Sequence, residues 1–92
     1  MRFEWDEDKN QTNIAKHGGS FQTAKQVFDD PFHVSFAHRL EDGEQRWLTF
    51  GMVGGLAVLA VAQIYRQAGE EVIRIISARR ATRREKRSFE DG

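Results

Sequence analysis

The feature that most constrains this chain is the segment LAVLAVAQIY at residues 56–65, which is apolar at nearly every position. A strand with this pattern has no face suited to water, so other parts of the chain or a partner must cover both of its sides. The wider apolar stretch, residues 50–65, is shorter than the ~20 residues that cross a bilayer, and glycines and Gln63 interrupt it. We therefore interpret residues 56–65 as the central strand of a sheet, and we expect no membrane association.

The residues on either side of this segment alternate between apolar and polar side chains, which is the period of a strand. Turn sequences separate them: EDGE contains the Asp-Gly pair favoured in hairpins, a glycine pair precedes the central segment, and QAGEE follows it. The expected strands cover residues 32–38, 45–52, 56–65 and 72–77, with turns at 41–44, 54–55 and 67–71. Because consecutive strands with short connections usually pair, the sequence predicts a four-stranded antiparallel meander.

The residues before and after the meander predict a short strand and three helices. FEW at residues 3–5 is the strand candidate, and Asp6 can cap a helix over residues 7–17 that ends at Gly18. Ser20 can cap a second helix, which the DDP sequence at 29–31 ends, and Ser77 is expected to cap a third, basic helix. The expected fold is α+β with one domain over residues 1–92, because a chain of this length buries one modest core.

The chain has no net charge, yet half of its cations lie in its last 20 residues. Residues 73–92 carry seven Lys and Arg against three acidic residues, whereas residues 1–72 carry seven against eleven. In the expected C-terminal helix, all six basic residues between positions 79 and 87 fall opposite an arc that contains Ala81, Glu85 and Phe89. This basic face is either a solvated surface or the binding surface of an anionic partner, and the opposite arc is too small and polar for a membrane helix.

Two arginines at the expected start of this helix are candidates for a phosphate site. Arg79 and Arg80 would lie in its first turn, where the helix dipole disfavours cations and a bound anion would reverse that effect. The free backbone N–H groups of a helix start and the forked guanidinium donors of arginine both suit phosphate oxygens. The plainer alternative is a basic face exposed to water.

Three further residues stand close to these arginines in the expected fold. Arg66 follows Tyr65 at the end of the central strand, where it either marks the approach of a turn or lies near Arg79 as a second phosphate contact. Glu85 is a carboxylate on the inward arc, where either Arg74 or Arg66 pairs with it, or it is exposed and pairs with a neighbouring arginine on a frayed helix. Cationic neighbours would favour its charged and weakly basic form, so Glu85 would hold arginines in place rather than act as a base.

The remaining motifs exclude several classes of enzyme. The chain has no cysteine, which excludes a thiol nucleophile, a disulfide framework and cysteine-bound zinc. The three histidines lack metal-ligand spacing, and no phosphate-binding loop or dinucleotide motif is present, so we expect neither a metal nor a cofactor. His17 either stabilises the end of its helix or transfers protons. One chemistry needs only such groups: cleavage of RNA by attack of its own 2′-hydroxyl on the adjacent phosphate.

The two ends of the chain resemble a known family. FEWDEDKNQTNIAKHGGSF contains the frame W-D-x-x-K-x-x-x-N-x-x-K-H-G-x-S-F, and IRIISARRATRREKRSFE closes the sequence. Both strongly resemble the BrnT family, toxins of type II toxin–antitoxin systems whose fold is similar to that of RelE-type ribonucleases. The resemblance implies a small ribonuclease that arrests translation.

The resemblance also implies roles for individual residues. Arg79 and Arg66 would stabilise the scissile phosphate, and Lys16 or His17 would assist proton transfer or bind the backbone. The expected RNA-binding residues are the other cations of the C-terminal segment, namely Arg80, Arg83, Arg84, Lys86 and Arg87. Glu85, Arg74 and Tyr65 would support the site.

The expected partners follow from the same resemblance. They are an RNA substrate and a BrnA-like antitoxin with a ribbon-helix-helix domain, in a complex of two copies of each chain that reaches operator DNA only through the antitoxin. The acidic N-terminus lacks the features of a signal peptide, so we expect a cytoplasmic protein. Two alternatives remain from the residues alone: a nucleic-acid-binding module without catalysis, and an interaction protein whose basic helix docks on an acidic partner.

Overall fold

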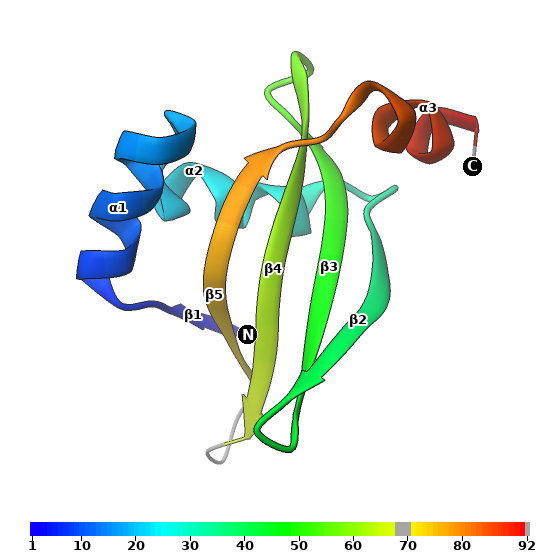
Figure 1. The fold of residues 1–92 in the computed structure, drawn as a ribbon. Coiled ribbons are helices and arrows are strands. Elements are labelled where there is room, and N and C mark those ends of the chain that lie inside the picture. Colours follow the sequence, from blue (N-terminus) through cyan, green and yellow to red (C-terminus); the bar gives the residue numbers. More distant parts are fainter. Residues whose placement is uncertain (68–70, 92) are drawn as a thin grey trace.

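The computed structural model describes residues 1–67 and 71–91, which form one five-stranded sheet with helices on both of its faces (Figure 1). In chain order the elements are β1 (Arg2–Glu4), α1 (Glu7–His17), α2 (Phe21–Ala24), the 3-10 helix η1 (Lys25–Asp29), β2 (Val34–Glu41), β3 (Glu44–Val53), β4 (Ala57–Gln67), β5 (Glu71–Arg80) and α3 (Arg83–Asp91). The sheet order is β1-β5-β4-β3-β2. The expected antiparallel strands are present as β2 to β5, but β1 pairs in parallel with β5, so the sheet is mixed rather than purely antiparallel.

Local signals in the sequence determine the ends of the first helices, as predicted. The Asp6 carboxylate accepts hydrogen bonds from the backbone N–H groups of Asp8 and Lys9, at 2.8 and 3.4 Å. Gly18 ends α1 in the left-handed conformation, with φ of 81°. Ser20 caps α2 by accepting a hydrogen bond from the Thr23 N–H. These helices continue through η1 to residue 29, which matches the expected end before Pro31.

The hairpin turns also follow the sequence. Asp42 and Gly43 have φ values of 54° and 77°, and Gly54 and Gly55 have 64° and 68°. Two successive residues with positive φ form the turn type whose twist matches that of antiparallel strands. The expected turn at 67–71 falls largely on residues 68–70, which lie outside the described residues.

The end of β5 differs from the prediction. Strand β5 continues past Ser77 to Arg80, and α3 begins only at Arg83, so Ser77 caps no helix. Two contacts keep this part extended: β4 pairs with β5 as far as Arg80, and on the other edge the Asn13 amide of α1 donates to the Ala78 carbonyl at 2.9 Å and accepts from the Ala78 N–H at 3.1 Å. Asn13 thereby takes the place of a neighbouring strand along the edge of β5 that β1 does not reach, and the chain stays extended there.

The true cap of α3 is Thr82. Its hydroxyl accepts a hydrogen bond from the Glu85 N–H at 3.1 Å, and the Glu85 carboxylate accepts one from the Thr82 N–H at 2.8 Å. This reciprocal pair is a capping box, and the sequence Thr-Arg-Arg-Glu carries its signature.

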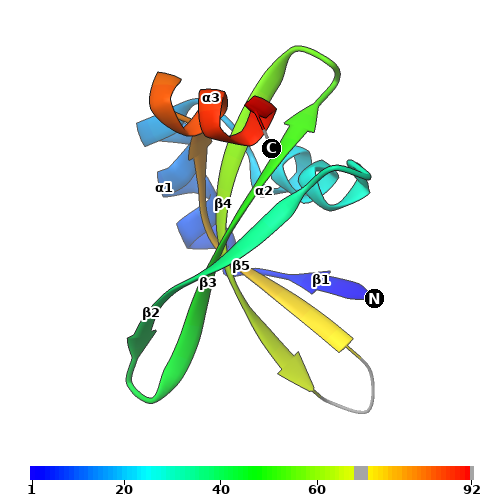
Figure 2. The same ribbon diagram turned by 90° about the vertical axis from the view of Figure 1, so that its right-hand side faces the viewer.

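Each face of the central strand is covered, as its apolar sequence requires. On one face Val61 packs in a cluster with Phe21 and Val27 from the α2–η1 segment. On the other face Val58 and Ala60 pack with Phe50, and Phe89 of α3 lies against this second cluster. Figures 1 and 2 show α3 beside the end of the sheet at which β5 stops. No helix within residues 1–67 and 71–91 is long and apolar enough to cross a membrane.

Candidate active site

The best-defined charged contact of the C-terminal segment joins Arg79 on β5 to Glu85 on α3. The guanidinium donates two hydrogen bonds to the carboxylate, Nη1 to Oε1 at 2.8 Å and Nη2 to Oε2 at 3.1 Å. Chiefly through these bonds with Arg79, and also through hydrogen bonds with Thr82, the pKa of Glu85 falls from 4.5 to about 2, and Glu85 raises the pKa of Arg79. Glu85 is therefore ionised and a poor base, as predicted, but its partner is Arg79 rather than the expected Arg74 or Arg66.

The expected phosphate site at a helix start is not formed by Arg79 and Arg80. Both residues lie on β5, and the first turn of α3 holds Arg83 and Arg84 instead. The N–H of Glu85 in this turn already binds the Thr82 hydroxyl. Any phosphate contact of Arg79 must therefore use its guanidinium, which carries five N–H donors, only some of which are engaged by Glu85 and the Arg80 carbonyl.

The end of α1 brings His17 to this part of β5. A surface hollow of about 280 Å³ is lined by His17, Arg79 and Arg80, together with residues of the α1–α2 connection and of the β3–β4 hairpin. The strand register places Arg80 opposite Leu59, which packs against the helical cluster, so the Arg80 side chain extends from the face that α2 and η1 cover. Arg79 lies opposite Ala60 of the second cluster, and its guanidinium binds Glu85 on the α3 face, so residue 79 borders the hollow while its side chain extends to the other face of the sheet. The hollow thus combines an imidazole, which can transfer protons, with the guanidinium of Arg80, which can stabilise phosphate charge.

Lys16 lies on the neighbouring side of His17. A second hollow, of about 300 Å³, is lined by Lys16, His17, Ile76 and Ser77 with residues of α1. His17 therefore stands between two hollows that follow the same edge of β5. Both Lys16 and His17 are exposed to solvent, and within the described part of the chain neither makes a side-chain hydrogen bond or ion pair.

Arg66 does not join this group. It pairs with Val72 near one end of β4, whereas Arg79 pairs with Ala60, six residues away along the same strand. At about 3.3 Å per residue, this separation is about 20 Å. The prediction that Arg66 lies near Arg79 is therefore wrong, because the two arginines lie at opposite ends of the paired strands β4 and β5.

Arg66 instead belongs to a cluster around Glu4. The Glu4 carboxylate binds Arg74 at 2.8 Å and Arg66 at 3.3 Å, and these arginines lower its pKa. Tyr65, the third expected supporting residue, packs its ring edge-on against Trp47 and accepts a hydrogen bond from the Gln63 amide. Arg74 and Tyr65 therefore do not contact Arg79 or Glu85.

The other expected RNA-binding residues are exposed on the C-terminal segment: Arg80, Arg83, Arg84, Lys86 and Arg87. Within the described residues none of them makes an ion pair. The same part of the chain contains no cluster of three potential metal ligands among its histidine and acidic side chains.

Two residues that organise the site were not predicted from the sequence. Asn13 fixes the edge of β5 beside His17, and only its place in the frame W-D-x-x-K-x-x-x-N marked it. Thr82 caps the helix that contains Glu85, and the spacing Thr-x-x-Glu in the sequence indicates such a cap. Several other residues of the frame have structural roles, since Asp6 and Ser20 cap helices and Trp5 packs edge-on against Phe21.

Comparisons with known proteins agree with this fold. Residues 5–85 match the family described as the ribonuclease toxin BrnT of type II toxin–antitoxin systems. The crystal structure of the Brucella abortus ribonuclease toxin BrnT is similar, with a TM-score of 0.68 and 32% sequence identity over 90% of this chain and 99% of that chain. A comparison with curated proteins found no match. Because the family match spans most of the sequence, this chain belongs to the BrnT family of ribonuclease toxins of type II toxin–antitoxin systems.

Proposed function

We propose that the chain is a metal-independent endoribonuclease that arrests translation by cleaving RNA at the hollow between α1 and β5. The observation that carries this proposal is that His17, Arg79 and Arg80 border one hollow, with the Arg80 guanidinium on its side of the sheet and the Arg79 guanidinium on the α3 side, although they come from opposite ends of the sequence. These are the groups that cleavage by the RNA's own 2′-hydroxyl needs: a proton-transfer group and cations beside the phosphate.

In the proposed reaction the 2′-oxygen bonds to phosphorus and the bond to the 5′-oxygen of the next nucleotide breaks. The 2′-hydroxyl gives up its proton, the departing 5′-oxygen gains one, and the products are a cyclic phosphate and a 5′-hydroxyl end. The RNA passes over the end of β5, so that Arg80 on the side of the hollow and Arg79 on the side of α3 stabilise the charge on the phosphate oxygens, and Glu85 holds the Arg79 guanidinium in position. His17 transfers a proton, and Lys16 assists that transfer or binds the RNA backbone.

Residues farther from the hollow act on the rest of the RNA in this proposal. Arg66, about 20 Å away along β4, contacts the backbone rather than the reacting phosphate. The exposed cations of α3, Arg83, Arg84, Lys86 and Arg87, attract RNA through charge. The likeness to RelE-type ribonucleases stays a prediction from the sequence.

The experiment is cleavage of a purified messenger RNA in EDTA, with mapping of the new 5′ ends. Arg79→Ala should lower the cleavage rate by about 100-fold or more, because it removes a preorganised charge at the transition state. Arg39→Ala is the control, since Arg39 is an exposed arginine that pairs with Glu41 on the distant β2–β3 hairpin. Full activity of Arg79→Ala, or loss of wild-type cleavage in EDTA, would contradict the proposal.

Membership of a type II toxin–antitoxin family implies an antitoxin partner. We propose that this partner is a BrnA-like ribbon-helix-helix protein, that the complex holds two copies of each chain, and that it reaches operator DNA only through the antitoxin. Light scattering on the complex co-purified with the product of the adjoining gene would measure the stoichiometry. A mass other than that of two copies of each chain would exclude the proposed assembly.

The exposed cations of α3 also favour a second candidate, an RNA-binding protein without catalysis. It predicts binding that weakens with salt, with a slope that falls by about one for each basic residue removed, and no new RNA ends. The mapping experiment separates the two candidates.

A further inference from the structure

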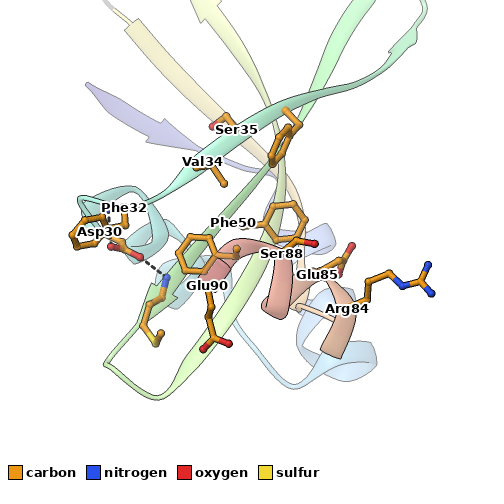
Figure 3. Close-up of a pocket in the computed structure, with 12 residues that line it drawn as sticks. Asp30, Phe32, Val34, Ser35, Phe50, Arg84, Glu85, Ser88 and Glu90 are labelled. Carbon is orange, nitrogen blue, oxygen red and sulfur yellow. Dashed lines mark hydrogen bonds between the residues drawn. The ribbon is translucent and has the colours of Figure 1, made fainter. Parts of the chain in front are cut away.

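A large apolar groove lies between α3 and the β2–β3 hairpin, away from the hollow assigned to RNA. Its volume is about 1140 Å³, and its walls include Val34 and Phe36 of β2, Phe50 of β3 and Phe89 of α3 (Figure 3). Several apolar side chains at the groove face solvent: Phe32 is 78% exposed and Phe36 57% exposed. Contiguous apolar surface of this kind usually marks a site that another molecule covers.

The wall formed by β2 offers backbone groups as well. Strand β2 is the last strand of the sheet, so one of its edges has no neighbouring strand among the described residues. It is eight residues long, and residues 34–40 are all exposed. Long exposed edges invite pairing with a further strand, whose backbone would bind the edge and whose alternate side chains would enter the groove.

The two ends of the groove differ in charge. Arg84, in the first turn of α3, lies at one end, and Phe32 with Asp30 lies at the other (Figure 3). The last turn of α3 carries Glu90 and Asp91 at the negative end of the helix dipole, where a partner's cation would be favourable. The two inner carboxylates are already satisfied, since Asp30 accepts hydrogen bonds from the Met52 and Phe32 N–H groups and Glu85 binds Arg79.

These features fit a peptide better than RNA. The groove wall is mainly apolar, and its acidic end would repel phosphates. An extended peptide satisfies both parts of the surface, because its backbone pairs with β2 and its side chains fill the space below α3.

We propose that an extended, apolar segment of the antitoxin binds along the free edge of β2 as a sixth strand and fills this groove. An acidic residue of the segment lies beside Arg84, and a basic residue lies beside Glu90. The inference rests on membership of a family that has an antitoxin, and it does not require that His17, Arg79 or Arg80 cleave RNA, since none of these three lines the groove.

The test measures binding of the intact toxin to the antitoxin encoded beside it, by titration calorimetry. Phe36→Glu should raise the Kd by at least about thirtyfold, because it places a charge at the centre of the proposed contact. Leu40→Glu is the matched control: Leu40 is also apolar, 70% exposed and on β2, but it lies outside the groove and beyond the irregularity between Ala37 and Arg39. Its Kd should stay within about threefold of the wild type.

Hydrogen exchange of the wild-type complex provides a second measurement that does not depend on a variant's folding. The antitoxin should protect backbone amides in residues 34–37 and 84–90. Wild-type affinity of Phe36→Glu, or protection confined to other regions, would overturn the inference. Protection of the same amides by RNA, or by self-association of the toxin without antitoxin, would assign the groove to a different occupant and would also overturn it.

Discussion

Replacing Glu85 with glutamine tests whether the Arg79 pair stabilises the fold through charge. The Glu85→Gln variant keeps the capping box, because a glutamine side chain can also bind the N–H of the capping threonine, so the substitution isolates the ion pair. The pKa of Glu85 falls from 4.5 in the unfolded chain to about 2 in the folded protein. At about 1.36 kcal/mol per pKa unit, the ionised Glu85 contributes at most about 3.4 kcal/mol to the free energy of unfolding.

Solvent screening reduces that limit. The side chains of Arg79 and Glu85 are 37% and 26% exposed, so we expect a contribution of about 1–2 kcal/mol to the free energy of unfolding. For a domain of this size, each kcal/mol changes Tm by about 4–8 °C. Glu85→Gln should therefore lower Tm by about 4–16 °C at pH 7.

The pH dependence distinguishes this mechanism from a simple packing defect. Because folding lowers the pKa of Glu85, the stabilisation is fully present above pH 4.5 and is lost as the pH falls towards 2. The Tm difference between wild type and Glu85→Gln should thus shrink by more than half between pH 7 and pH 3, as followed by circular dichroism. Glu90→Gln, in the same helix and exposed, is the control and should change Tm little. A difference that does not vary with pH, or no difference at pH 7, would refute the reasoning.

Two further variants test how the sheet is held, both by urea denaturation. Gly51→Ala should cost about 1–3 kcal/mol, because a Cβ at this position would lie 2.7 Å from Val27 Cγ1 and 2.8 Å from the Val27 carbonyl oxygen. Gly19→Ala is its control, since nothing lies within 4 Å of a Cβ there, and an equal cost for both would exclude the steric explanation. Asn13→Ala should cost about 2–4 kcal/mol by leaving the buried N–H and carbonyl of Ala78 without their partner, and a loss below about 1 kcal/mol would show that water replaces it.

Local signals were sufficient to predict most of the elements. Asp6, Gly18 and Ser20 determine helix ends through contacts with residues at most four positions away, so the sequence near each of them contains the whole signal. The same holds for the Asp42-Gly43 and Gly54-Gly55 turns, whose backbone conformations few other residues adopt easily.

The end of β5 could not be predicted in this way. Ser77 follows an apolar run and precedes a helix-forming sequence, so a local interpretation makes it a cap. The contacts that keep residues 78–80 extended come from β4, which pairs with all three, and from Asn13, which binds Ala78 from 65 residues away along the chain, and nothing near Ser77 indicates them. The distance between Arg66 and Arg79 depends in the same manner on the register between β4 and β5, which includes an irregularity between Ala62 and Gln63.

The pairing of charges explains why a neutral chain has so basic an end. Arg66 and Arg74 share the Glu4 carboxylate, and Arg79 binds Glu85, so these arginines are partly neutralised within the fold. The five exposed cations between Arg80 and Arg87 have no such partner among the described residues, and β5 and α3 carry them to one end of the sheet. Eight of the eleven acidic residues of residues 1–72 lie in or directly beside α1, η1 and the β2–β3 turn, and none of these eight forms an ion pair with the exposed cations. A polyanion approaching the molecule is therefore drawn first to α3, and from there the nearest hollow that combines arginine with histidine is the one beside β5.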